Sequence, residues 1–287
     1  MNKPIIILLS AVALTACGKT VKKVESPVGY DFSAPVKYEM KNSLEEISGI
    51  AFYPGSAAVM LAIQDEDGKL FYWNNGDPQS VQHLTFGEHG DYEDVGVSKN
   101  TVVVMRSDGV LFTMPVSEVK AGELKNVKKW KDLIPEGEYE SLYVDGNSEK
   151  MIILCKNCSV DKKDGSTVSG FELELKEDGS PVLKNKFAIN TEGIKKFKPK
   201  WQGPLKPSAV TFNSKTNEWF ILASVNKLLV VTDQNWNIKQ VVSLNLSPFP
   251  QPEGITFDID NNLYISNEAG NTPKGTVLKF PYKAAHG

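Results

Sequence analysis

QPEGITFDIDNNLYIS, residues 251–266, contains two alternating strand-like segments joined by a tight turn. The turn runs from Asp258 to Asn262, and Asp and Asn favour turns because their side chains hydrogen-bond the nearby backbone. The opening of this stretch returns four more times: a residue that is often acidic or hydroxylated, a small or acidic one, then an apolar–any–apolar triplet that opens a strand. The five copies are EISGIAF from Glu46, DYEDVGV from Asp91, EYESLYV from Glu138, KPSAVTF from Lys206 and QPEGITF from Gln251.

The spacing of the copies identifies the repeated unit. Successive third positions lie 45, 47, 68 and 45 residues apart, and they hold Ser48, Glu93, Glu140, Ser208 and Glu253. A period near 45 residues is typical of a propeller blade of four strands. Further runs rich in β-branched and aromatic residues follow each copy, separated by Gly, Asp or Asn. The pattern predicts an all-β chain folded as a single β-propeller of five four-stranded blades.

The long third interval leaves a six-bladed propeller open as an alternative. We favour an insertion, because four strand segments already fill the third blade and leave the Lys- and Pro-rich stretch 193–206, GIKKFKPKWQGPLK, as a loop. The last blade has only about three strands before the chain ends. A strand near 29–41 is expected to supply its fourth and to close the ring, so that no exposed sheet edge invites aggregation.

The N-terminus has the features of a secretory signal. Residues 1–16 carry a basic Lys3 and an apolar run that is too short to span a membrane stably. The string LTAC ending at Cys17 resembles a bacterial lipobox, which implies cleavage before Cys17 and lipid attachment to its sulfur; a soluble secreted protein is the alternative. Gly18 resembles an outer-membrane sorting signal, so we expect a lipid-anchored monomer of the cell envelope that faces the periplasm. Residues 17–28 are then a linker, and 29–287 form the propeller.

Charge and cysteine content exclude some classes of protein. The 32 basic residues against 35 acidic ones give a mild net charge of −3, which does not suggest a nucleic-acid partner. Cys155 and Cys158 form CKNC at the end of a predicted strand, and we expect either a disulfide, for which the chain must turn, or two free thiols. A thioredoxin-like site would need a helix that this context lacks, and two thiols without histidine are a poor zinc site.

One mouth of the channel is expected to collect most of the functional side chains. In a propeller the starts of the inner strands and the ends of the second strands share a face, so Glu93, Glu140 and Glu253 should converge as a calcium site. The alternative is that each glutamate bonds the backbone of a neighbouring blade. Second-strand ends supply the predicted ligand-binding residues: Asp65, Glu66, Arg106, Asp108, Lys156, Asn157, Asn267 and Glu268.

Arg106 is the only arginine of the chain. It either grips a carboxylate or phosphate of a ligand or pairs with Glu93, Glu140 or Asp108. Of the three histidines, His89 alone is placed to reach this mouth. The sequence contains no G-x-S-x-G, P-loop or H-E-x-x-H motif, so it does not identify catalytic residues, and a binding protein is favoured over an enzyme.

The motifs resemble those of the SdiA-regulated, YjiK-like family of bacterial envelope β-propellers. The segments that carry the resemblance are ISGIAF followed by IQDEDGKLFYW, GDYEDVGV followed by Arg106-Ser107-Asp108, and QPEGITFDIDNNLYISNE. CKNC and AGNTPKG depart from the family pattern. The resemblance implies the fold and an envelope location, and it implies no biochemical activity.

Two functions follow as hypotheses. The first is a membrane-tethered binding propeller, whose acidic mouth holds calcium and recognises a small polar ligand or an envelope protein. The second is a calcium-dependent hydrolase similar to propeller phytases or lactonases, in which the metal polarises the substrate and activates water. In that case Glu93, Glu140 and Glu253 would bind the metal, while Arg106 and Lys156 would hold the substrate.

Overall fold

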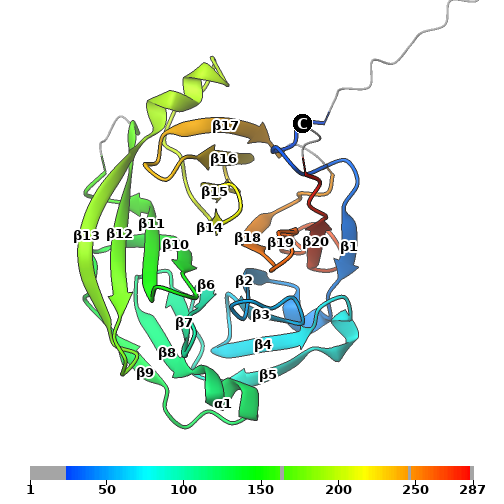
Figure 1. The fold of residues 1–287 in the computed structure, drawn as a ribbon, viewed down its shortest axis with the longest axis vertical. Helices are drawn as coiled ribbons and strands as arrows, with labels where there is room; N and C mark the ends of the chain where they lie inside the picture. The colour runs from blue at the N-terminus through cyan, green and yellow to red at the C-terminus, as the bar shows by residue number, and fades with distance from the viewer. Residues whose placement is uncertain (1–23, 162–164, 245–246, 285–287) are drawn as a thin grey trace, which may run out of the picture.

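Five antiparallel sheets of four strands stand around a central channel in the computed structural model, which describes residues 24–161, 165–244 and 247–284 (Figure 1). The predicted all-β, five-bladed propeller is thereby confirmed. The predicted signal peptide, Cys17 and the linker as far as residue 23 lie outside the described residues. Within the described part of the chain, no helix has the length and apolar character that crossing a membrane requires.

Each of the first four blades is formed by consecutive strands, with the innermost strand first. Blade one contains β2 (Ile47–Phe52), β3 (Val59–Gln64), β4 (Lys69–Asn74) and β5 (Gln82–Thr85). Blade two contains β6 (Tyr92–Val97), β7 (Thr101–Arg106), β8 (Leu111–Pro115) and β9 (Lys128–Trp130). Blade three contains β10 (Gly137–Val144), β11 (Lys150–Cys158), β12 (Thr167–Leu175) and β13 (Pro181–Asn190). Blade four contains β14 (Ala209–Asn213), β15 (Glu218–Ala223), β16 (Leu228–Thr232) and β17 (Ile238–Ser243).

The fifth blade joins the two ends of the chain. Its strands are β18 (Pro252–Phe257), β19 (Leu263–Asn267), β20 (Thr276–Phe280) and, on the outside, β1 (Val36–Glu39). β1 pairs antiparallel with β20, so the predicted closing strand near 29–41 is confirmed in its position. A short 3-10 helix, η1 (Asn42–Leu44), then leads into blade one. Closure of this kind covers the edge of β20, which would otherwise be free to pair with another chain.

Part of the segment that we assigned to the linker lies against the propeller. Val24 packs on the core cluster between blades four and five, and the Ser26 hydroxyl accepts a hydrogen bond of 2.9 Å from the Phe32 amide. The Glu25 carboxylate accepts a hydrogen bond of 2.9 Å from the Ser243 amide of β17. The N-terminal end of the described chain is therefore fixed to blade four.

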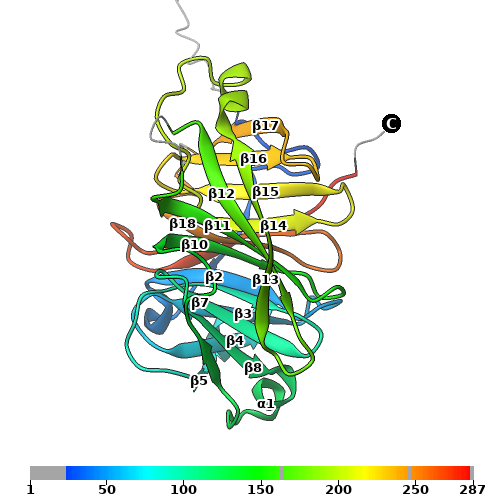
Figure 2. The same ribbon diagram turned by 90° about the vertical axis from the view of Figure 1, so that its left-hand side faces the viewer.

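Besides η1, three short helices connect strands in the described part of the chain. α1 (Val116–Ala121), which the sequence pattern did not predict, follows β8 and ends at Gly122 with φ 77°, a left-handed conformation that favours glycine. η2 (Pro78–Ser80) precedes β5. η3 (Thr191–Lys196) occupies the start of the stretch that we predicted as a loop, and the Asn190 side chain caps it by accepting from the Glu192 amide. Figure 2 shows η3 and the chain that follows it projecting beyond the rim of the ring.

Five apolar clusters form the core of the described residues, and each one lies between neighbouring blades. The innermost strands approach closely, which explains the small residues at the fourth motif position. A Cβ added to Gly49 would lie 2.5 Å from the Asp94 Cα, and one added to Gly254 would lie 2.5 Å from the Ser48 carbonyl oxygen. Such overpacking is expected to be destabilising.

Candidate functional site

A β-bulge occupies the third motif position of the innermost strand in blades two, three and five. On β6, Tyr92 pairs with Arg106 and Asp94 with Met105, so that Glu93 has no partner on β7. On β10 the residue left out is Glu140, and on β18 it is Glu253. A bulge leaves one residue unpaired and redirects its side chain. The repeated motif therefore gives three glutamates the same displaced position at the same end of the channel.

The three predicted metal ligands lie close enough to affect one another. Burial and the nearby Glu140 carboxylate raise the pKa of Glu93 to about 10, and burial and Glu140 raise that of Glu253 to about 7. Like charges and loss of water both disfavour the ionised carboxylate. The predicted convergence of Glu93, Glu140 and Glu253 at one mouth agrees with these shifts, while their role as metal ligands stays a prediction.

Glu140 is engaged by a lysine. Lys156 is itself displaced in a bulge of β11, because Glu138 pairs with Asn157 and Tyr139 pairs with Cys155. Its ammonium contacts Glu140 and lies 3.1 Å from the Glu138 carboxylate. Burial acts to lower the pKa of Lys156, but hydrogen bonds to Glu140 and Glu138 raise it above its ordinary value. Lys156 is therefore a charged group that neutralises part of the mouth.

A disulfide joins Cys155 to Cys158 across this bulge, with 6.0 Å between their Cα atoms. The sequence left a disulfide and free thiols open, and the structure contains the disulfide. The bulge at Lys156 takes the place of the turn that we expected to be needed. The bridge therefore encloses the residue that pairs with Glu140.

Serine and aspartate side chains hold neighbouring blades together near the channel. The Ser48 hydroxyl donates to the Glu93 carbonyl at 2.6 Å, and the Ser266 hydroxyl donates to the Ser48 carbonyl at 2.6 Å. The buried Asp94 carboxylate accepts from the Leu142 amide of blade three at 2.8 Å. Glu253 in turn forms a side-chain hydrogen bond with Ser224 at the end of β15 in blade four, so the alternative role of the glutamates as links between blades stays a prediction.

A second group of carboxylates is tighter than the predicted one. Glu46, Asp65 and Glu268 offer oxygens that all lie within 4.8 Å of one another. Glu46 is the first residue of the blade-one motif, Asp65 follows β3, and Glu268 follows β19 of the adjoining blade. We predicted Asp65 and Glu268 as ligand-binding residues but missed Glu46, although it begins the same motif whose third position we used.

This second group has an oxygen in need of a partner. The Asp65 Oδ1 atom is buried and has no hydrogen-bond partner in the described structure. Burial, together with Glu46 and other nearby carboxylates, raises the pKa of Asp65 to about 6, and burial with Glu253 raises that of Glu268 to about 8. The Glu268 carboxylate accepts a hydrogen bond from the side-chain amide of Gln251. Buried unsatisfied oxygens beside acidic groups are typical of sites for water or a cation.

The predicted basic ligand-binding residues already have partners. Arg106 donates two hydrogen bonds to Asp108, of 2.9 and 2.6 Å, which is the pairing that we considered as one alternative. This hydrogen bond raises the pKa of Arg106 and lowers that of Asp108. Lys156 is held by two glutamates, as described above. The described part of the mouth therefore has more acidic groups than basic groups that remain free to bind a ligand.

The remaining predicted residues are dispersed. Asn157 and Glu66 are exposed at the rim, whereas Asn267 is fully buried, with its Oδ1 atom unpartnered and its amide donating to Thr276 at 3.3 Å. His89 is 87% exposed in its side chain and lies 3.2 Å from Asp67, so it faces the outer rim. The structure brings Asp65 and Glu268 together, and Glu66 lies next to Asp65, whose pKa it helps to raise.

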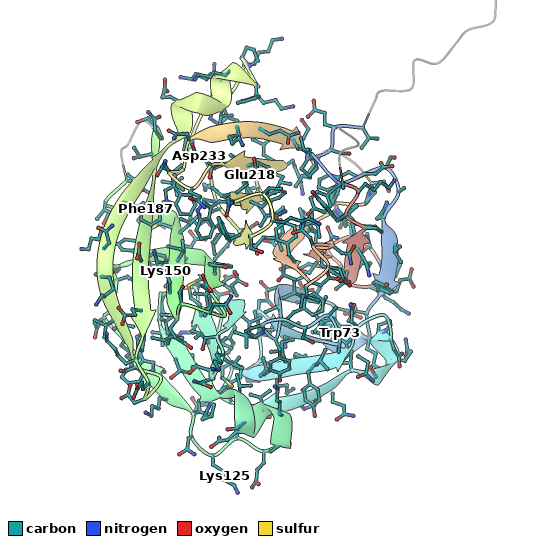
Figure 3. The ribbon with its side chains drawn as sticks, viewed as in Figure 1. Trp73, Lys125, Lys150, Phe187, Glu218 and Asp233 are labelled. Atoms are coloured by element: carbon teal, nitrogen blue, oxygen red, sulfur yellow. A yellow bond between two sulfur atoms is a disulfide. The ribbon has the colours of Figure 1, made fainter. Side chains whose placement is uncertain are left out.

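The opposite mouth of the channel opens into a cavity of about 640 Å³. Apolar residues of the inner strands line its depth, and the turns that follow those strands line its rim. Asp258 at this rim accepts hydrogen bonds from the backbone and side chain of Asn262, both of 2.8 Å, and it therefore closes the turn that we predicted there. The side chains that surround the channel are drawn in Figure 3.

Comparisons with solved structures show the same fold. The glutaminyl cyclase of Myxococcus xanthus is 11% identical, with a TM-score of 0.57, and the match covers 86% of this chain and 95% of that one. A luciferin-regenerating enzyme is 9% identical, with a TM-score of 0.51, over 88% of this chain and 96% of that one. At such low identity the likeness concerns the fold alone. No curated protein sequence matches the chain.

A family model connects the chain to known sequences. The model described as SdiA-regulated matches residues 205–271, which contain all of blade four and strands β18 and β19 of blade five. This segment includes QPEGITFDIDNNLYISNE, one of the stretches that carry the resemblance in the sequence. The chain therefore contains a segment that matches the SdiA-regulated family within a five-bladed β-propeller, and the predicted resemblance is confirmed over residues 205–271.

Proposed function

We propose that the protein is a membrane-tethered propeller of the bacterial envelope whose acidic mouth holds calcium and binds a small polar ligand or an envelope protein. The observation that carries the proposal is the group formed by Glu46, Asp65 and Glu268, whose oxygens lie within 4.8 Å of one another. Three separate segments of chain supply these residues, so the fold, and not a single loop, brings them together.

The chemistry of this group fits a calcium ion. Calcium prefers carboxylate and other oxygen ligands, and the three side chains offer only oxygen. The buried Asp65 Oδ1 atom has no other partner in the described structure, and a cation would supply one. Burial and the neighbouring carboxylates raise the pKa values of Asp65 and Glu268, so a cation would be needed to favour their ionised forms. Glu46, Asp65 and Glu268 would therefore hold the ion, which would neutralise their charge.

The glutamates on the bulges add further carboxyl groups toward the channel, and a cation bound beside them would favour their ionised forms. Glu140 is paired with Lys156, which leaves Glu93 and Glu253 as the freer members of the predicted metal set. A mouth lined by charges of one sign concentrates ligands of the opposite sign. A small polar ligand that carries positive charge fits this mouth. The sequence predicts the calcium at Glu93, Glu140 and Glu253, of which Glu140 is paired with Lys156.

The geometry favours binding over the alternative, a calcium-dependent hydrolase. That alternative assigns Arg106 and Lys156 to the grip on a phosphate or lactone, but Asp108, Glu138 and Glu140 already occupy these cations. An anionic substrate would have to displace those carboxylates in a strongly acidic mouth. The fold shared with two enzymes gives no argument for hydrolysis, because a common fold does not imply a common activity.

Calorimetric titration of calcium into chelator-stripped protein tests the proposal. The protein is the chain from residue 17 onward with Cys17→Ala, which keeps every described residue. We expect saturable binding that E46Q/E268Q abolishes and that D260N, a change of an exposed aspartate at the opposite mouth, leaves intact. E93Q/E253Q changes only glutamates on the bulges, so it shows whether binding depends on them or on the group formed by Glu46, Asp65 and Glu268. An absence of binding by the folded wild-type protein would overturn the calcium assignment.

A separate measurement tests the tether. The mass of the N-terminal fragment of the full-length protein, expressed in a bacterium that processes lipoproteins, is expected to show lipid on Cys17. The same preparation with Cys17→Ala should lose the added mass and partition into the aqueous phase. An unmodified Cys17 in the wild-type chain would remove the membrane anchor from the proposal without touching the calcium site.

A further inference from the structure

The stretch 193–206, here called the lysine-rich insertion, is a strongly basic segment that has no role in the acidic mouth of the channel. Its fourteen residues include five lysines, Phe197 and Trp201, and contain no acidic residue. Figures 1 and 2 show that η3 and the chain after it project outward beyond the outer strands of blades three and four. The projection therefore extends sideways from the ring and not along the channel.

The N-terminal end of the described chain lies beside this insertion. The Lys198 ammonium donates to both oxygens of Glu25, at 3.0 and 2.7 Å, and to the Ser243 hydroxyl at 2.6 Å. Cys17 precedes Val24 by seven residues, and an extended chain spans at most about 3.5 Å per residue, or about 25 Å in total. A lipid on Cys17 would thus hold the side of the propeller that carries the insertion within that distance of the membrane.

The side chains of the insertion leave charge and apolar surface exposed. Lys195 pairs with Glu192 and Lys198 pairs with Glu25, whereas Lys196 and Lys200 are exposed and have no ion-pair partner among the described residues. Phe197, between them, is 40% exposed, although it is a large apolar residue. Lysines that alternate with aromatic residues are suited to the interface of a bilayer that contains anionic lipids.

We propose that the lysine-rich insertion docks on an anionic lipid surface, namely the membrane to which Cys17 tethers the chain. The proposal rests on the proposed tether for its orientation and on charge complementarity for its chemistry. Because the insertion projects from the rim, a membrane on this side lies beside the ring and leaves both mouths of the channel open (Figure 1). The acidic mouth would in any case repel anionic lipid, which agrees with that orientation.

The chain offers a matched control at its other end. The stretch KNVKKWK, residues 125–131, also combines four lysines with a tryptophan. Lys125 lies at the end of the molecule opposite to the insertion (Figure 3). Lys125 and Lys131 are both exposed. If net charge alone drew the protein to lipid, reversing these two lysines would matter as much as reversing Lys196 and Lys200.

The experiment measures co-sedimentation of the unlipidated chain, residue 17 onward with Cys17→Ala, with phosphatidylcholine vesicles that contain phosphatidylglycerol. We expect binding that weakens with salt and with removal of phosphatidylglycerol. K196E/K200E should reduce the partition coefficient by about tenfold or more, since each lysine near an anionic surface contributes about 1 kcal/mol. K125E/K131E should change it by less than about twofold on the same basis.

Two outcomes would overturn the proposal. If the two double variants lose equal amounts of vesicle binding, the binding arises from non-specific charge and not from the insertion. If the parent chain does not bind anionic vesicles, the proposed docking does not occur. Thermal unfolding of each variant shows whether a loss arises from misfolding, and F197S provides a second variant that leaves the charge unchanged and is expected to weaken binding as well. Because the protein in this assay carries no lipid, its result is independent of whether Cys17 is modified.

Discussion

Lys156 and Glu140 are the displaced residues of two facing bulges, one on β11 and one on β10, and their charged groups are in contact. Each side chain is mostly buried, with 17% of Lys156 and 10% of Glu140 exposed. The Cys155–Cys158 disulfide spans the bulge that carries Lys156. The position of Lys156 opposite Glu140 is therefore fixed by backbone geometry and a covalent bridge together.

Replacing one member of this pair should lower the free energy of unfolding more than replacing both. Lys156→Met leaves Glu140 and Glu138 without their cation in a mouth that is already acidic, and we expect a loss of about 1–3 kcal/mol in the free energy of unfolding. K156M/E140Q removes both charges and should recover most of that loss. Urea unfolding of the three proteins measures this, and a double variant as unstable as K156M would show that the pairing is not what the lysine contributes.

Stability should fall as pH rises in the absence of calcium. The folded-state pKa values of Asp65, Glu253 and Glu268, about 6, 7 and 8, lie above the values near 4 of unfolded carboxyls. The folded protein thus binds more protons, so this stabilisation is complete below pH 4 and is lost as pH rises from about 4 to 8. The melting temperature of chelator-treated protein is expected to decrease between pH 5 and pH 8.

Calcium should oppose this loss. A cation bound at Glu46, Asp65 and Glu268 takes the place of the missing protons, and a ligand that binds only the folded state raises the melting temperature. The increase produced by calcium should therefore be larger at pH 8 than at pH 5, and absent in E46Q/E268Q. An equal increase at both pH values would separate calcium binding from these carboxylates.

The hydrogen bond from blade three to Asp94 should contribute more to the free energy of unfolding than a similar hydrogen bond inside a turn. The buried Asp94 carboxylate accepts from the Val95 amide and, across the blade boundary, from the Leu142 amide, both at 2.8 Å. Asp94→Ala leaves the Leu142 amide without its partner and should cost about 2–3 kcal/mol.

Asp145 provides the comparison, because it also accepts from two amides, those of Asn147 and Ser148, but within its own turn. Asp145→Ala should cost about 1 kcal/mol, since water can replace an acceptor at a partly exposed turn. Equilibrium unfolding of both variants checks the difference. Similar losses would mean that Asp94 acts locally and that the contact between blades depends on apolar packing.

The repeat in the sequence was sufficient to predict the architecture but not the bulges. Alternating apolar residues separated by turn residues predict the strands, because a strand must bury one face against its neighbour. The return of the motif about every 45 residues predicts that these strands form blades. The position of Glu93 on a bulge depends on the register between β6 and β7, and this register cannot be predicted from the sequence of one strand alone. For that reason the convergence of the third-position glutamates was predictable, whereas the capture of Glu140 by Lys156 was not.

The grouping of Glu46 with Asp65 and Glu268 was missed for a related reason. The residues belong to a motif start and to two second-strand ends, in blades one and five, and their distance depends on how the first and last blades meet. The sequence predicted that contact only as ring closure by a strand near 29–41. The exact angle between the closing blades, which sets the distance between side chains, is determined by packing in the cluster that contains Ile50 and Tyr264.

Tyr30 joins the N-terminal segment to blades four and five, and its hydroxyl should carry much of that connection. The Tyr30 hydroxyl donates to the Asn261 carbonyl at 2.9 Å and accepts from the side-chain amides of Asn213 and Asn261, at 3.1 and 2.8 Å. Tyr30→Phe leaves these buried groups without their partner, and we expect it to lower the free energy of unfolding by about 1–3 kcal/mol.

Tyr282 supplies a control, since its ring lies 5.6 Å from that of Tyr30 and its hydroxyl has no hydrogen-bond partner among the described residues. Tyr282→Phe should change stability by less than about 0.5 kcal/mol, as is usual for a change that breaks no buried bond. Urea unfolding compares the two variants, and hydrogen exchange of β1 and β20 shows whether the Tyr30 variant loosens the closing blade first. Equal stability of the two variants would show that ring closure depends on the β1–β20 pairing and the surrounding apolar core, without a contribution from the Tyr30 hydroxyl.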